Sequence, residues 1–263
     1  MKLLSPLRMA LAVFSIFFLL LPIVVTVVSS FTEANYPTFP QAGFSLKWYA
    51  KILERPEFIT AFLNSVKFAT IASVGAVVLG TLSSIAIARY QFPGKNFLVS
   101  IFTAPLTVPQ IVLGVALIIY FTPFGLTGTT TGYILSHIVI CVPYIIRYVL
   151  TGLSGYDYTI ERAAVILGAN PWTVFWKVTV PLVRPAMLSG ALFSFLISFD
   201  NVTLSIFMVS PEVRTLPIEL FSRMQDAYDP LIASVSTIVV LITVVFIALL
   251  ERIYGVGKLY GGN

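Results

Sequence analysis

Long apolar stretches separated by short polar segments organise this sequence. They predict membrane-crossing helices at residues 9–30, 60–88, 97–123, 130–153, 186–208 and 231–250. A helix needs about 20 mostly apolar residues to cross the hydrocarbon core of a bilayer, and each stretch is near or above that length. The runs are continuous rather than alternating over about ten residues, so membrane strands are not expected. The predicted fold is therefore all-α, with six transmembrane helices forming a single transmembrane domain over residues 1–263.

The composition agrees with a chain whose solvent is lipid. Of the 263 residues, 58% are hydrophobic and only 10% are charged, and the mean hydropathy is +0.96. A soluble domain carries about a quarter charged residues, so this chain has too little polar surface to cover itself in water. The first apolar stretch is longer than a signal-peptide core and no A-x-A cleavage site follows it, so we expect it to be the first crossing.

Lysine and arginine are unevenly divided between the two sides of the predicted helices. Ten basic and three acidic residues fall in the N-terminal segment, in the loops near 89–96 and 147–184, and in the C-terminal tail. The opposite side holds six basic and seven acidic residues. An excess of lysine and arginine marks the cytoplasmic side, which predicts that both termini are cytoplasmic. Because the basic residues follow the sides of the membrane rather than forming a patch, no nucleic-acid partner is expected.

Candidate catalytic and metal chemistry is scarce. His137 and Cys141 are the only histidine and cysteine, four residues apart in apolar sequence, which favours packing or hydrogen bonding over a metal site. A phosphate-binding loop of the form G-x-x-x-x-G-K-[ST] does not occur, since Gly94-Lys95 is followed by Asn96. No nucleophile with a base and no paired acids share one depth, as a membrane enzyme would require. We therefore predict no catalytic residue, no metal ligand and no cofactor bound by this chain.

The long loop at residues 154–185 contains a predicted amphipathic helix. Its apolar positions, spaced i, i+3, i+4 and i+7, are Ile160, Ala163, Ala164 and Leu167. Asp157 or Thr159 can cap its start, and Gly168 can end it in a left-handed conformation. The pattern alone leaves two interpretations open, a helix lying at the membrane interface or a helix that docks against a partner protein.

A second short helix is predicted to follow. Asn170 and Pro171 are typical of a helix cap and first helical position. Pro181 and Pro185 are expected to stop this helix before the fifth crossing begins.

The residues of this loop resemble a known signature. The spacing A-A-x-x-L-G-A at 163–169, followed by Phe175, Lys177-Val178, Val180-Pro181 and Arg184-Pro185, resembles the cytoplasmic EAA signature of ABC-importer permeases. The segments FSLKWYAKIL at 44–53 and ARYQFPGK at 88–95, and the stretch from Asn64-Ser65 to Ala69-Thr70, resemble the second permease subunit of spermidine/putrescine-type importers. The similarity extends from near residue 10 to about 250.

The resemblance implies a type I ABC-importer permease in a bacterial inner membrane, working by alternating access. Its implied partners are a second permease in a heterodimer, two ATPase subunits that hold ATP and Mg²⁺, and an external solute-binding protein. The implied ATPase-coupling residues are Glu161, Arg162, Ala163, Ala164, Leu167 and Gly168. The signature glutamate falls at position 162, which is Arg162 here, and Glu161 lies about 100° away around a helix. An ion pair made through that glutamate is therefore in question.

Asp200 is the most conspicuous polar residue in the predicted crossings. With a helix starting near Pro185, it would lie about 22 Å along the axis, inside the apolar core. Ionisable residues there usually face a cavity or a partner. A polar stripe continues along the same helix through Ser194, Ser198, Asn201 and Ser205. Small polar residues of this kind can hydrogen-bond neighbouring helices together or line a solute path.

The third predicted crossing carries a similar stripe. Its members are Thr103, Thr107, Gln110 and Gly114, beside two prolines, Pro105 and Pro109, that should kink the helix. We predict a substrate path lined by Asp200, Asn201, Ser198, Thr107 and Gln110, for a polyamine or other cationic amine. An amino-acid derivative is the alternative solute. An ion-gradient-driven carrier is a further alternative, but it should show charged relays in several crossings.

The topology can be tested directly. Reporter fusions after Asn263 should signal a cytoplasmic location, and fusions in the 209–229 loop an external one, because the basic residues gather on one side. Alkaline phosphatase activity and green fluorescence, which require opposite sides of the membrane, measure the two locations. An external C-terminus would contradict the assignment.

Overall fold

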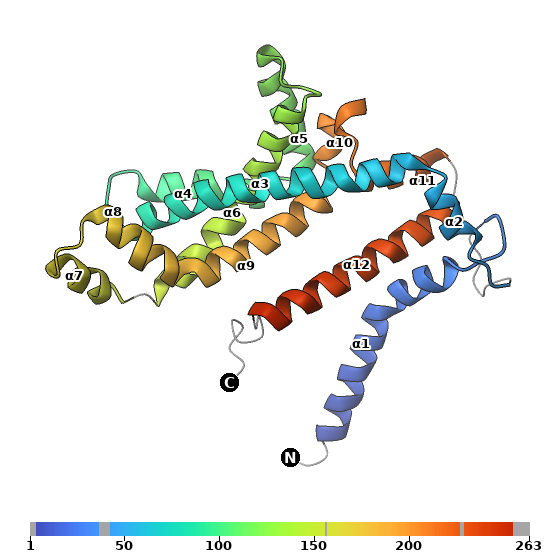
Figure 1. Ribbon diagram of the computed structural model, residues 1–263, viewed down its shortest axis with the longest axis horizontal. Coiled ribbons are helices and arrows are strands. Elements are labelled where there is room, and N and C mark those ends of the chain that lie inside the picture. Colours follow the sequence, from blue (N-terminus) through green and yellow to red (C-terminus); the bar gives the residue numbers. More distant parts are fainter. Residues whose placement is uncertain (1–3, 37–42, 156, 227–228, 255–263) are drawn as a thin grey trace. The chain divides into compact units, whose positions relative to one another are not determined.

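The computed structural model describes residues 4–36, 43–155, 157–226 and 229–254. Over these ranges the chain is built from helices (Figure 1), apart from an isolated antiparallel bridge between Thr32 and Phe44. The all-α prediction is therefore confirmed. The chain divides into two compact units, one of residues 1–59 with 220–263 and one of residues 60–219. Each unit is described by itself.

The first unit holds residues 220–226 of α11 (Leu216–Asp226) and three complete helices. They are α1 (Leu4–Ser29), α2 (Lys47–Leu53) and α12 (Pro230–Tyr254). The first and last run antiparallel (Figure 1), with the Ser234 hydroxyl donating to the Ser30 carbonyl over 3.0 Å. The indole N–H of Trp48 donates to the Thr32 carbonyl over 2.9 Å and holds α2 in place. The described side chains along the first two thirds of α1 are exposed and, apart from Arg8 and Ser15, apolar, as expected for a helix facing lipid.

The second unit is a bundle of long helices with shorter ones attached. The long helices are α3 (Pro56–Arg89, with its first turn in the other unit), α6 (Thr130–Ser154) and α9 (Val180–Phe199). The shorter elements are α4 (Lys95–Thr103), η1 (Ala104–Leu106), α5 (Gln110–Phe121), η2 (Thr122–Phe124), α7 (Thr159–Ile166), α8 (Pro171–Val174), η3 (Phe175–Thr179), α10 (Ser205–Met208), η4 (Pro211–Val213) and the first turn of α11, residues 216–219.

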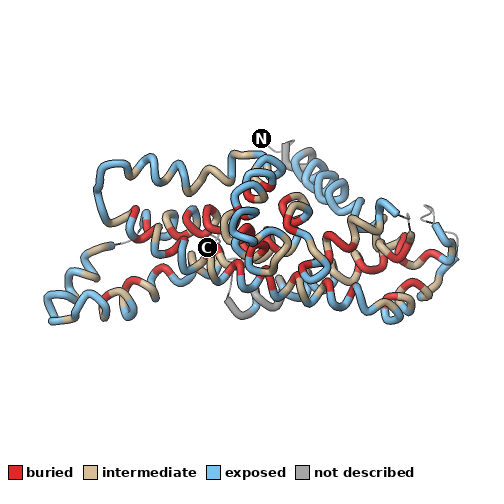
Figure 2. Tube along the Cα trace, turned by 90° about the horizontal axis from the view of Figure 1, so that it is seen from above, coloured by how far each residue is buried: buried red, intermediate tan, exposed pale blue. Residues whose placement is uncertain are grey.

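Close packing in the second unit depends on glycines. A Cβ atom on Gly80 of α3 would lie 2.6 Å from the Cβ of Ile145 in α6, and one on Gly190 of α9 would lie 3.1 Å from Ile145 Cδ1. Small residues let membrane helices approach closely enough for van der Waals packing, which drives their association in lipid. Buried and exposed residues alternate along the helices (Figure 2), as expected when one side faces protein and the other faces lipid.

Four helices in the described part of the chain are long and apolar enough to cross a membrane. They span Arg8–Ser29, Pro56–Arg89, Thr130–Ser154 and Pro171–Phe199. A bent pair, Lys95–Leu106 with Gln110–Phe124, would make a fifth. The described apolar part of α12, Pro230–Phe246, is shorter. The count of six crossings and the location of the termini remain predictions, and residues 1–3 and 255–263 lie outside the described ranges.

The third predicted crossing, 97–123, is broken rather than kinked. Its two helical parts are bent by 108°. The break falls at Pro109, whose φ of −54° and ψ of 131° are extended rather than helical. A proline has no backbone N–H to donate, and it disfavours helical geometry in the residue before it. The polar stripe predicted along this crossing therefore does not lie on one continuous helix face.

The fifth crossing starts earlier and ends earlier than the predicted 186–208. The helix runs without a break from Pro171 to Phe199, so Pro181 and Pro185 do not stop it, and the predicted loop 154–185 is shorter than expected. Pro181 follows a π-helical turn, Phe175–Thr179, and the residue four positions before it lies in that turn. The wider turn relieves the contact that a proline ring makes with the carbonyl of the preceding turn.

Candidate functional site

The N-cap position of α7 is Tyr158, which makes no side-chain cap bond, but Asp157, one of the two predicted caps, lies just before it and bonds the first residue of the helix. Its Oδ1 atom accepts a hydrogen bond of 2.9 Å from the backbone N–H of Thr159. This bond stabilises the carboxylate and lowers the pKa of Asp157. A negative charge at the first turn also complements the dipole of the helix.

The end of α7 has the predicted left-handed glycine. Gly168 has a φ of +89°. Its N–H donates to the Val165 carbonyl over 2.9 Å, and the Ala169 N–H donates to the Ala164 carbonyl over 3.0 Å. This pair of bonds is a Schellman motif, which terminates α7 and turns the chain sharply.

The next helix begins as predicted. The Asn170 side chain accepts a hydrogen bond of 2.8 Å from the Thr173 N–H, and Pro171 occupies the first helical position. The segment from Asp157 to Val174, called the α7–α8 segment below, is thus shaped by caps that its own residues supply.

No residue of α7 is fully buried. Ile166 is 84% exposed and Leu167, which follows it at the end of the helix, is 87% exposed. Ile160 and Ala163 of the predicted apolar face are also exposed, whereas Ala164 is half-buried. A cluster of open apolar side chains is typical of a surface that another protein or a membrane covers.

Glu161 points inward, toward the bundle. Its Oε1 atom forms an ion pair with Arg89 Nη2, at the end of α3. The Thr179 hydroxyl donates to the same Glu161 oxygen over 2.6 Å and accepts a bond of 2.6 Å from Arg89 Nη2. Thr179 is fully buried and the two charged side chains are mostly buried. This Arg89–Glu161–Thr179 cluster joins α7 to α3 and to the π-turn before α9.

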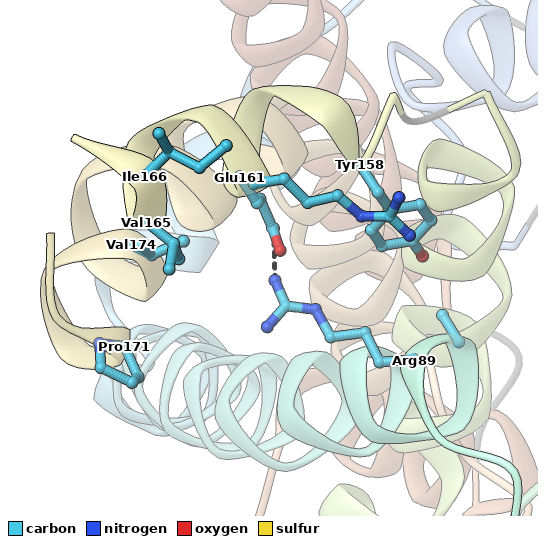
Figure 3. Close-up of a pocket in the computed structure, with 9 residues that line it drawn as sticks. Arg89, Tyr158, Glu161, Val165, Ile166, Pro171 and Val174 are labelled. Atoms are coloured by element: carbon cyan, nitrogen blue, oxygen red, sulfur yellow. Dashed lines mark hydrogen bonds and ion pairs between the residues drawn. The ribbon is translucent and has the colours of Figure 1, made fainter. Parts of the chain in front are cut away.

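The cluster forms one wall of an open pocket of about 630 Å³. In Figure 3, Arg89 and Glu161 reach toward each other across the space between α3 and α7. The lining includes Arg89, Glu161, Arg162, Val165, Ile166 and Val174. Sequence reasoning missed Arg89 and Thr179, although Arg89 lies in the ARYQFPGK segment that carried part of the resemblance.

Arg162, the neighbour of Glu161, is exposed. Among the ion pairs of the described residues, none includes Arg162. The two charges of this helical turn therefore differ in role: the acid is held inside the protein and the base is open to a partner.

Two predicted path residues meet across the broken helix. The Asn201 side-chain amide donates to Gln110 Oε1 over 3.1 Å, and Asn201 Oδ1 accepts from the Leu204 N–H over 2.9 Å. Asn201 is buried, and Gln110 is half-buried at the first turn of α5. The contact joins α5 to the chain that follows α9.

Ser198, a predicted path residue, belongs to a buried network of hydrogen-bonded side chains. Its hydroxyl is 2.8 Å from His137 Nδ1, and His137 Nε2 is 3.1 Å from the Ser205 hydroxyl. The Tyr133 hydroxyl is 2.9 Å from the same Ser205 oxygen. All four residues are buried. The network links α6 to α9 and α10, which favours the interhelical interpretation of Ser198.

The expected hydrogen bonding of the lone cysteine is confirmed as well. Cys141 Sγ donates to the Ser194 carbonyl, and the Ser194 hydroxyl donates to the Cys141 carbonyl, each over 3.3 Å. In the described part of the chain, no three histidine, cysteine or acidic side chains lie together as a possible metal site.

Asp200 does not lie inside a helix, which corrects the prediction. It is the exposed C-terminal cap of α9, and its N–H donates to the Leu196 carbonyl over 3.0 Å. The helix begins fifteen residues or so before the predicted start, and its last residue is Phe199. Among the described residues, no ion pair includes Asp200.

Thr107, another predicted path residue, is exposed. Its hydroxyl donates to the Ala104 carbonyl of its own turn rather than to Gln110 or Asn201.

Comparison with known proteins identifies the family. Residues 76–256 match the family described as binding-protein-dependent transport system inner membrane component. The chain belongs to this family. It is therefore a multi-pass inner-membrane permease subunit of a binding-protein-dependent transport system, and the predicted family and location are confirmed.

Two curated relatives are similar over most of their length. The chain is 29% identical over 230 residues to the spermidine/putrescine transport system permease protein PotC of Escherichia coli strain K12, covering 88% of this chain and 87% of PotC. It is 30% identical over 243 residues to the putrescine transport system permease protein PotI of the same strain, covering 89% of this chain and 86% of PotI.

A solved structure shares the fold. A chain of a bacterial ABC transporter involved in the import of the acidic polysaccharide alginate superposes with a TM-score of 0.76 and 14% identity, covering 96% of this chain and 97% of that one. At this identity the likeness concerns the fold alone.

Proposed function

We propose that this chain is one of two permease subunits of an ATP-driven importer for a polyamine or another cationic amine. A separate ATPase subunit binds ATP with Mg²⁺ and hydrolyses it, and an external binding protein delivers the solute. This chain supplies no catalytic group. It converts movement of the ATPase into opening and closing of the membrane path.

The observation that carries this proposal is the construction of the α7–α8 segment. α7 exposes an apolar surface, yet the Arg89–Glu161–Thr179 cluster anchors it to membrane-crossing helices. A partner that grips the exposed surface can therefore move α3 and the helix that continues into α9. Because Glu161 is the α7 side chain that is mostly buried and no residue of α7 is fully buried, a large share of this transmission passes through the cluster.

The solute side of the proposal depends on Asp200 and the Gln110–Asn201 pair. Asp200 offers an exposed carboxylate without an ion-pair partner in the described chain, which attracts a cation. The nearby amides at the start of α5 and after α9 can hydrogen-bond amine groups. The names of the two curated relatives, both of which refer to putrescine, support an amine as solute.

Uptake by the reconstituted importer tests the energy source. Proteoliposomes containing this chain, the second permease and the ATPase should accumulate radiolabelled putrescine or spermidine only when ATP and Mg²⁺ are inside and binding protein is outside. Ionophores that collapse ion gradients should leave uptake unchanged. A non-hydrolysable ATP analogue is the control. Uptake driven by an ion gradient without ATP would contradict the proposal.

Replacing Gly168 tests the coupling segment. Gly168→Leu should leave the complex assembled in the membrane but lower transport per ATP about tenfold, because a side chain in the left-handed region costs roughly 1–2 kcal/mol and distorts the end of α7. Gly155 is the matched control, since its φ is −99° and, as at Gly168, an added Cβ would meet no atom within 4 Å. Gly155→Leu should transport normally, and equal behaviour of the two variants would exclude a role for the turn.

Removing the charge of Asp200 tests the solute side. Asp200→Asn keeps the shape of the side chain, so assembly and basal ATP hydrolysis should survive while uptake of a cationic amine falls about five- to tenfold. Glu212→Gln is the control, because Glu212 is an exposed acid of the same unit. Normal uptake by Asp200→Asn would reject the electrostatic role, and loss of assembly would indicate a structural one.

A further inference from the structure

The pocket beside α7 carries an excess of positive charge. Arg89 and Arg162 contribute two positive charges to its lining, and Glu161 contributes one negative charge. That negative charge is already satisfied, because the Glu161 carboxylate accepts hydrogen bonds from both Arg89 and Thr179. The pocket therefore presents one uncompensated positive charge to whatever covers it.

The donors of the two pocket arginines differ in their access to a partner. The Nε atom of Arg89 is buried and makes no hydrogen bond to a described residue. The guanidinium of Arg162 is exposed, and no ion pair of the described residues engages it. Arginine presents its donors in a planar fork that matches a carboxylate, so an acidic side chain is the natural complement.

The residues around this positive charge indicate that the pocket is covered by a protein rather than by a lipid surface. Ile166 and Leu167 are apolar and 84% and 87% exposed, which suits the buried centre of a protein interface. Helices that lie on anionic membranes carry several basic residues on their polar face. Arg162 is the one basic residue of α7, and Glu161 is its immediate neighbour.

We propose that the pocket between α7, α8 and the end of α3 receives an acidic side chain of the ATPase subunit, which pairs with Arg162. The inference rests on the proposed function and adds that the permease contributes the positive charge of the contact and the ATPase the negative one. Glu161 acts inside the permease and Arg162 acts at the interface. The polarity is therefore the reverse of that expected from the glutamate that the EAA signature carries at position 162.

Retention of the ATPase on the permease tests this assignment. The complex is placed in nanodiscs of phosphatidylcholine, which removes anionic headgroups, and ATPase binding is measured against NaCl concentration. Wild-type binding should weaken with salt, because exposed charge pairs are screened. Arg162→Gln should weaken binding at low salt about fivefold and Arg162→Glu at least about tenfold, with Arg162→Lys closest to wild type.

Matched controls separate this contact from general charge effects. Lys177 is exposed and lies outside the pocket lining, so Lys177→Gln and Lys177→Glu should change binding less than about twofold. A scan that replaces acidic residues of the ATPase surface with lysine should contain a variant that restores binding to Arg162→Glu. Glu161→Gln should retain the ATPase but lower transport per ATP, because it breaks the internal cluster.

The outcomes that overturn the inference are distinct from failure of the proposed function. If the wild type binds the ATPase and the Arg162→Gln and Arg162→Glu variants bind it with the same affinity, this contact alone is overturned. An Arg162 effect that appears only in discs of anionic phosphatidylglycerol would assign the pocket to a lipid headgroup and overturn it too. A wild-type complex that binds no ATPase at low salt would overturn both the contact and the proposed function.

Discussion

In lipid, a polar group has no water to bond, so every buried donor and acceptor needs a partner within the protein. In the bundle of α3, α6 and α9, where Thr81 Oγ1 is buried without a partner among the described residues, hydroxyls, one imidazole and backbone carbonyls provide most of these bonds. The network through Tyr133, His137, Ser198 and Ser205 is the main example. Each such bond contributes about 0.6 kcal/mol on average in a membrane protein, but together they select one arrangement of the helices.

One ion pair at an end of the bundle is placed where it can serve coupling. The ion pair between Arg89 and Glu161 and the hydroxyl of Thr179 hold an otherwise loosely packed helix against the membrane helices. Burying an ion pair is costly unless further hydrogen bonds satisfy its polar atoms. Thr179 supplies one such bond to each member of the pair, while Arg89 Nε has no partner among the described residues. This separates anchoring by Glu161 from recognition by Arg162, although the two residues are adjacent in sequence.

Irregular backbone in this protein coincides with the proposed path. The backbone leaves helical geometry at Pro109, just before Gln110, and again after Phe199, where α9 ends. The side chains of Gln110 and Asn201 satisfy each other there. Interrupted helices at membrane depth are tolerated where protein or a water-filled cavity surrounds them, which is the environment a solute path requires.

The sequence by itself determined the all-helical membrane fold, the family and the local shape of the α7–α8 segment. Apolar run length, the hydrogen bond of Asp157 at the start of α7, the Asn170 cap and the left-handed Gly168 depend on consecutive residues, so they can be predicted from neighbouring positions. Only the tertiary structure decided the partner of Glu161, since Arg89 is 72 residues away in sequence. It also decided that the helix continues past Pro181 through a π-turn and that it ends at Phe199, which leaves Asp200 at its exposed end instead of in its interior. Such outcomes depend on contacts between distant segments, and hydrophobic periodicity carries no information about them.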